Sequence, residues 1–163
     1  MEYKQLVVVI CSIIKDNSIL LIERNKGEYR GKLALVGGKI EPGEHIKDAA
    51  KRETKEETGL DTKFSSLKGL ISEVYKENKN KKHFLLYLTE LIPTNAEIIE
   101  SNEGKLKWVN LEKLEDYKDQ LIPSDYMMIE EIVKNNRDGY FECEMEISQI
   151  NQDLEIKRFE KII

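Results

Sequence analysis

The most informative segment of this chain is GKIEPGEHIKDAAKRETKEETGL, residues 38–60. Residues 46–58 are predicted to form an amphipathic helix, because apolar residues recur at helical spacing and a glycine follows where the helix would end. On a helical wheel, one face begins and ends with apolar residues but carries Glu53 and Glu57 in its middle and Glu56 on its flank. An ordinary amphipathic helix turns apolar side chains toward the core, so these carboxylates need a separate explanation.

A solvated helix laced with ion pairs is the alternative interpretation of such a charged segment. The wheel argues against it, because like charges about 6 Å apart repel by about 3 kcal/mol at an effective dielectric constant of about 20. Turning Glu53 and Glu57 inward also removes their hydration. A cation among the carboxylates would offset both effects, and Mg²⁺ and Mn²⁺ prefer oxygen ligands. The preceding pair Gly37-Gly38 would let the backbone approach a ligand closely, since no Cβ intervenes.

The remainder of the chain predicts many strands and few helices, which favours an α+β fold with helices covering a mixed sheet. The predicted strands are 6–14, 18–22, 33–36, 64–75, 83–91, 106–109, 139–147 and 154–159. The further predicted helices are 111–117 and 123–135. A charged loop is expected at 76–82, and loops are expected at 25–32 and 39–45.

Length and charge limit the class of protein. The 163 residues suit one domain. Lys and Arg number 26 against 31 Asp and Glu, and this net charge of −5 argues against binding to duplex nucleic acid. Cys11 and Cys143 lack metal-ligand spacing and are expected to be reduced, as in a cytoplasmic protein. The apolar run 6–14 is shorter than the roughly 20 residues that a membrane span needs, and is expected to be a strand and not a signal peptide.

The fixed spacing of charged residues and glycines resembles the Nudix box. The matching positions are Gly38, Glu44, Arg52, Glu53, Glu56, Glu57 and Gly59. A chance match at a given start is on the order of one in 10⁸. Thr54 stands where an aliphatic residue is usual, at a position of structural importance.

The resemblance implies a single Nudix domain over residues 1–163, an α+β fold built as an α/β/α sandwich around a mixed sheet. It implies that Mg²⁺, or Mn²⁺ in its place, is held by Gly37, Glu53, Glu56 and Glu57. A metal-activated water would attack phosphorus, with Glu53 as the first candidate for the base. Glu44 and Arg52 would pair and brace the loop against the helix.

The resemblance extends to residues outside the box. Glu103, five residues before Trp108, is placed like the additional acidic ligand or base that many members carry. Glu97 and Glu100 are the nearby alternatives, and a solvated loop glutamate is the other interpretation. Arg24 would bind substrate phosphates, although a lone arginine is also a common surface charge. Gly38 and Lys39 are also expected to contact the substrate.

The branch that looks closest hydrolyses oxidised purine nucleoside triphosphates such as 8-oxo-dGTP. The features that resemble it are the glycines and lysine at 37–39, the segment 121–125 and the ending 138–141. Asp125 would meet the purine edge, since a carboxylate accepts hydrogen bonds from N–H donors. An acidic residue favoured at a helix N-terminus is an equal alternative. Residues 33–34, Leu-Ala, replace the Trp-Asn pair of some members, which removes a stacking surface there.

Other substrates remain open at this point. ADP-ribose, a dinucleoside polyphosphate and the 5′ end of RNA would undergo the same chemistry. A ligand-sensing domain without turnover is disfavoured, because such domains usually lose carboxylates of the box and this chain keeps all of them. The expected partner is therefore a small-molecule nucleotide, without a membrane or duplex nucleic acid, and the oligomeric state stays open.

Overall fold

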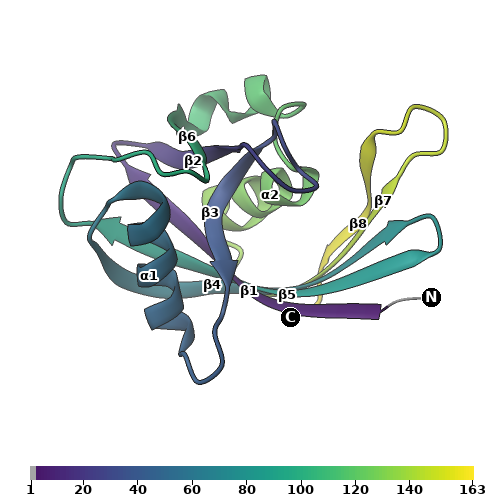
Figure 1. Cartoon of the computed structure of the whole chain (residues 1–163), viewed down its shortest axis with the longest axis horizontal. Coiled ribbons are helices and arrows are strands. Elements are labelled where there is room, and N and C mark those ends of the chain that lie inside the picture. The colour runs from purple at the N-terminus through teal and green to yellow at the C-terminus, as the bar shows by residue number, and fades with distance from the viewer. Residues whose placement is uncertain (1–2) are drawn as a thin grey trace.

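A single mixed sheet organises the computed structural model, which describes residues 3–163 (Figure 1). Its eight strands have the order β6-β2-β3-β1-β5-β4-β7-β8. They are β1 (Tyr3–Lys15), β2 (Ser18–Arg24), β3 (Leu33–Lys39), β4 (Thr62–Glu77), β5 (Asn80–Pro93), β6 (Gly104–Asn110), β7 (Gly139–Ile147) and β8 (Leu154–Lys161). The helices are α1 (Ile46–Thr58), the 3₁₀ helix η1 (Leu111–Tyr117), α2 (Pro123–Met127) and the π-helical turn η2 (Met128–Lys134). The predicted α+β fold with a mixed sheet is therefore confirmed.

Strand β1 is the centre of the sheet. It pairs in parallel with β5 and antiparallel with β3, so its alternate side chains face opposite sides. Val9 and Cys11 pack in one apolar cluster with Ala49 and Ala50 of α1. Ile10 packs in a second, larger cluster, which includes residues of η2. The sheet is thus covered by helices on both faces, and Figure 1 shows α1 and α2 flanking β3.

Helix α1 has the bounds that its sequence predicts, and its C-terminal end is set locally. Gly59 adopts a left-handed conformation with φ of 73° and donates its N–H to the Lys55 carbonyl, which ends the helix. Ala49 and Ala50 are fully buried, and their small side chains let the helix lie close to the sheet. The glutamates of the inward stripe share this face of α1 and are at least partly buried.

The predicted charged loop at 76–82 is wrong. Strand β4 continues to Glu77 and β5 begins at Asn80, so a two-residue turn joins them. Asn78 takes φ of 54° in this turn, a conformation that asparagine tolerates well. The lysines and glutamates of this stretch extend from the paired hairpin, because solvated charges do not prevent backbone pairing. Strand β3 likewise runs past Val36 and through the glycine pair to Lys39.

Both cysteines are buried and free, as expected. Within the described part of the chain, no helix combines the length and apolar character that crossing a membrane requires.

The paired glycines of β3 give a test of the fold. A Cβ on Gly37 would lie 2.2 Å from the Val9 carbonyl oxygen, whereas a Cβ on Gly38 would meet the movable carboxyl group of Glu53 at about 2.5 Å. Gly37→Ala must therefore separate β1 from β3, and we expect it to lower the free energy of unfolding by about 2 kcal/mol or more. Gly38→Ala, the matched control, should keep most of the stability. Urea unfolding measures the stability of both variants. Equal stability of the two would contradict the close approach of β1 and β3 at Gly37.

Candidate active site

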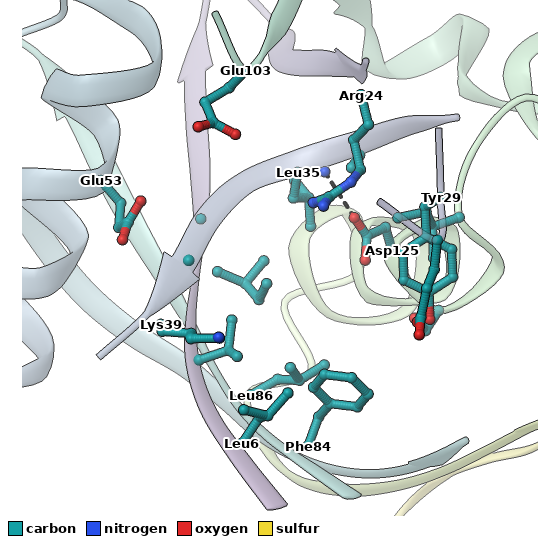
Figure 2. A pocket seen from close by; sticks show the side chains of 18 of the residues that line it. Leu6, Arg24, Tyr29, Leu35, Lys39, Glu53, Phe84, Leu86, Glu103 and Asp125 are labelled. Atoms are coloured by element: carbon teal, nitrogen blue, oxygen red, sulfur yellow. Dashed lines mark hydrogen bonds between the residues drawn. The ribbon is translucent and has the colours of Figure 1, made fainter. Parts of the chain in front are cut away.

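A cavity of about 820 Å³ opens between the edge of α1, the strands β1, β3 and β5, and the start of α2 (Figure 2). Glu53 and Glu103 lie toward one end of it, and Tyr29 and Asp125 toward the other. Apolar side chains of β1 and β5 form one wall of the cavity, which includes Leu6, Phe84 and Leu86. The cavity thus has two polar ends and an apolar wall.

The first end carries the glutamates of α1. Glu57 is 8% exposed, and its Oε2 accepts a hydrogen bond from the Gly37 amide at 3.4 Å. Burial raises the pKa of Glu57 to about 8, and the negative charges of Glu53 and Glu103 add to this increase. Burial also raises the pKa of Glu53. Glu56 lines the cavity from a more exposed position. The inward stripe seen in the sequence therefore faces a cavity.

Glu44 and Arg52 form a two-pronged ion pair beside these glutamates. Arg52 donates from Nε to Glu44 Oε1 at 2.7 Å and from Nη2 to Oε2 at 2.9 Å. These bonds lower the pKa of Glu44 to about 2. Arg52 also donates to Glu53 Oε1 at 2.8 Å and to the Lys39 carbonyl at 3.1 Å. It connects the loop to the helix, and it holds Glu53 directly, which the sequence analysis missed.

The donor set of this end fits a hard divalent cation. Across residues 3–163, no three His, Cys, Asp or Glu side chains surround a common point closely enough to hold a metal. Arg52 holds one oxygen of Glu53, and Glu57 faces the Gly37 amide. The carboxylate oxygens are nevertheless the ligands that Mg²⁺ prefers. Gly38 leaves the Glu53 carboxyl group room that a Cβ would fill. A cation would also oppose the repulsion that raises the pKa of Glu57.

Glu103 lies on this cavity from the loop before β6. It forms an ion pair with Lys26 at 2.7 Å, and both side chains are exposed enough for this pair to contribute little stability. Glu100 instead accepts a hydrogen bond from the Leu106 amide at 3.1 Å. Neither Glu97 nor Glu100 lines the cavity. The structure thus favours Glu103 among these three residues as a participant.

The expected phosphate-binding residues also line the cavity. Arg24, Gly38 and Lys39 all contribute to its wall. The Arg24 Nε is buried and has no hydrogen-bond partner among the described residues. A buried N–H donor without a partner is suited to an anionic ligand.

Asp125 has a structural role that the sequence did not reveal. It is 6% exposed, and its Oδ2 accepts a hydrogen bond from the Leu35 amide at 2.8 Å (Figure 2). Burial raises its pKa to about 7, and the bond from Leu35 and the charge of Arg24 limit the increase. Asp125 also lies in the first turn of α2, the position of the alternative interpretation. It therefore ties α2 to β3 while it lines the cavity.

Glu73 of β4 was missed by the sequence analysis. It lines the cavity, is 4% exposed, and has an Oε2 without a hydrogen-bond partner among the described residues. Burial raises its pKa to about 7. A signal was present in the sequence, because Glu73 shares the inward alternation of Ile71 and Tyr75.

A family model described as the NUDIX domain matches residues 4–131. The chain belongs to the Nudix family. This Nudix protein is similar to an ADP-ribose pyrophosphatase of Methanocaldococcus jannaschii, with 40% identity over 80 residues that cover 49% of this chain. The matched segment spans only 47% of that relative.

For other similar proteins, the match spans a larger share of the relative. The nucleoside triphosphatase NudI of Escherichia coli is 28% identical over 120 residues, which cover 67% of this chain and 85% of the relative. Among solved structures, a MutT protein of Bacillus halodurans has a TM-score of 0.76 at 24% identity, covering 95% of this chain and 96% of that one. The structural likeness at this identity supports the fold alone.

The ion pair between Glu44 and Arg52 generates a prediction for this Nudix site. Glu44→Gln should lower kcat by about 10–100-fold, because Arg52 loses its charged partner and Glu53 loses its support. The stoichiometry of bound Mn²⁺ should stay unchanged, since Glu44 is expected to act through Arg52 and not on the ion. Steady-state kinetics and a Mn²⁺ titration measure the two effects. Glu41→Gln, an exposed change in the same loop, serves as the control, and loss of Mn²⁺ binding in Glu44→Gln would contradict the prediction.

Proposed function

We propose that this chain is a Mg²⁺-dependent nucleoside triphosphate hydrolase that releases a nucleoside monophosphate and pyrophosphate. The observation that carries the proposal is one cavity with the clustered carboxylates of α1 at one end, buried hydrogen-bonding groups at the other, and the cationic side chains of Arg24 and Lys39 on its wall. Its volume of about 820 Å³ suits a nucleotide-sized ligand. Among purine triphosphates, 8-oxo-dGTP is the best single candidate. Residues 1–163 form one such domain in this proposal.

The residues that would hold Mg²⁺ are Gly37, through its carbonyl oxygen, with Glu53, Glu56, Glu57 and Glu103. When bound, the ion supplies Lewis-acid stabilisation of charge on the phosphate oxygens. Arg24 and Lys39 orient the phosphate chain from the cavity wall. Glu53 is the first candidate for the base: burial raises its pKa, so it can accept a proton from the attacking water. That water forms the new P–O bond while pyrophosphate leaves with the electrons of the broken bond.

The second end of the cavity suits a base. The Trp-Asn pair expected before the glycines is absent at residues 33–34, but Phe84 and Tyr29 supply aromatic surface from other elements. Asp125 still offers its Oδ1, because only its Oδ2 is bound to the Leu35 amide. These groups support a purine that lies against an apolar wall with N–H donors directed at buried carboxyls.

ADP-ribose is the second candidate substrate. The similarity to an archaeal ADP-ribose pyrophosphatase, 40% over 80 residues, favours it. Hydrolysis of its phosphoanhydride bond would use the same α1 glutamates. Dinucleoside polyphosphates and the 5′ end of RNA require the same chemistry, and a panel of substrates separates all of these candidates.

The metal requirement gives a prediction for turnover. Activity should need Mg²⁺ or Mn²⁺ and should be lost in excess EDTA. Glu57→Gln should lower kcat on the order of 100-fold or more, because charge stabilisation at phosphorus weakens. The fold should survive, since the change removes a buried charge that repels Glu53. Asp48→Asn, on the exposed side of α1, is the matched control, and full turnover in EDTA would exclude the metal-dependent mechanism.

The substrate assignment is tested by kcat/KM for 8-oxo-dGTP, dGTP, dCTP and ADP-ribose in the presence of Mg²⁺. We expect 8-oxo-dGTP to rank first. Asp125→Ala would leave the Leu35 amide unpaired, so Asp125→Asn, which keeps an acceptor for it, is the sharper variant. It should lower kcat/KM for the preferred purine about 10-fold and change dCTP little. An unchanged ranking, or a wild type that prefers ADP-ribose, would remove the purine assignment and leave the Nudix chemistry intact.

A further inference from the structure

Glu73 is a buried carboxyl group that the proposed reaction does not use. It lies in the interior of the sheet, opposite Phe84 of β5 on one side and Cys143 of β7 on the other. Glu73 is 4% exposed, and its Oε2 is fully buried without a hydrogen-bond partner among the described residues. The side chain nevertheless lines the large cavity. The carboxyl group therefore lies between the core and the cavity, and a ligand in the cavity is the source from which it can gain a hydrogen-bond donor.

A purely structural role does not account for this residue. A buried polar atom without a hydrogen bond costs free energy, and a buried carboxylate costs more. The neighbouring inward positions of β4 hold Ile71 and Tyr75, whose side chains pack in the core cluster. An apolar side chain at residue 73 would continue that cluster at lower cost. The carboxyl group is consistent with a ligand that supplies the missing donor.

The surroundings of Glu73 define the chemistry of that ligand. The Ser124 hydroxyl stabilises its charged form, whereas burial and the nearby negative charge of Asp125 oppose it. Two carboxyl groups thus face the same end of the cavity, and although the charge of Arg24 also reaches Asp125, hydrogen-bond donors are the groups that suit both carboxyls. A ligand group with two adjacent N–H donors would satisfy both carboxyls. Asp125 already accepts from Leu35, so it suits a single ring N–H, and Glu73 suits an amino group.

We propose that Glu73 is a specificity residue whose carboxyl group accepts a hydrogen bond from the 2-amino group of a guanine-type base, with the adjacent ring N–H directed at Asp125. Adenine fits less well when Asp125 is ionised, because the ring nitrogen beside the adenine amino group is an acceptor and would face a carboxylate. Hypoxanthine keeps the ring N–H but lacks the 2-amino group, so it leaves Glu73 unpartnered. This inference rests on the proposed function only in that the cavity takes a nucleotide.

Equilibrium binding of GMP and IMP, measured by calorimetry with Mg²⁺ present, tests the proposal without requiring turnover. The wild type should bind GMP about 10-fold or more tightly than IMP, because IMP leaves a buried acceptor unpaired. Glu73→Met, which is similar in length and apolar, should weaken GMP to the affinity of IMP and change IMP less than about twofold. The wild type should also bind AMP more weakly than GMP.

Two further variants keep this test decisive. Glu73→Gln retains the shape and an acceptor oxygen without the charge, and should reduce the preference for GMP by about 3–10-fold; it decides the outcome if Glu73→Met does not fold. Thr62→Val is the matched control, because Thr62 lies on the same strand with a buried, unpartnered Oγ1 and does not line the cavity. It should leave the ratio of the GMP and IMP affinities unchanged.

Several results would overturn the inference: equal binding of GMP and IMP by the wild type, absence of binding of either, an unchanged ratio in the Glu73 variants, or parallel loss of both ligands. A wild type that discriminates GMP from IMP through Glu73 but hydrolyses no purine triphosphate would refute the proposed function and leave this inference standing. The reverse result would refute the inference alone.

Discussion

The burial of like charges along one edge of α1 is the constraint on which the rest of this site depends. Glu57 is almost completely buried and has a pKa of about 8, which shows how unfavourable its charge is without a counter-ion. The surrounding structure moderates this burial in two ways: the Gly37 amide donates to Glu57, and Arg52 donates to Glu53. Arg52 is in turn held by Glu44. A cation would complete an arrangement that the backbone and a single arginine satisfy only in part.

Buried carboxyl groups stand at both ends of the cavity, but the two ends suit different ligands. Burial raises the pKa of Glu57 at one end and of Glu73 and Asp125 at the other. The difference lies in the neighbours. At the α1 end, several carboxylates stand close to glycines that admit a ligand, which suits a small ion with a high charge. At the other end, two carboxyls stand among aromatic and aliphatic side chains, which suits flat N–H donors.

The sequence predicted the features whose causes are local. The bounds of α1 follow from its period and its terminal Gly59, and the spacing of the box identified the glutamates that line the cavity. Features that depend on tertiary contacts were either missed or predicted wrongly. Residues 76–82, predicted to be a loop, form a paired hairpin instead, because β4 and β5 keep their backbone pairing up to the turn despite the many charged side chains of this stretch. The bond between Asp125 and the Leu35 amide joins residues 90 positions apart, and no local pattern reports it. Glu73 was visible only as a charge in an inward position.

This division between local and distant contacts has a consequence for specificity. The groups expected to hold the cation come mainly from one continuous segment, from Gly37 to Glu57, so one helix and one strand end fix their relative positions. The groups at the other end come from separate elements: Tyr29 from a loop, Glu73 from β4 and Asp125 from α2. Their relative positions depend on the packing of the whole sheet. Substitutions there can change the accepted base while the hydrolytic end stays intact. A shared fold therefore constrains the reaction far more than it constrains the substrate, and the base has to be inferred from individual buried groups such as Glu73.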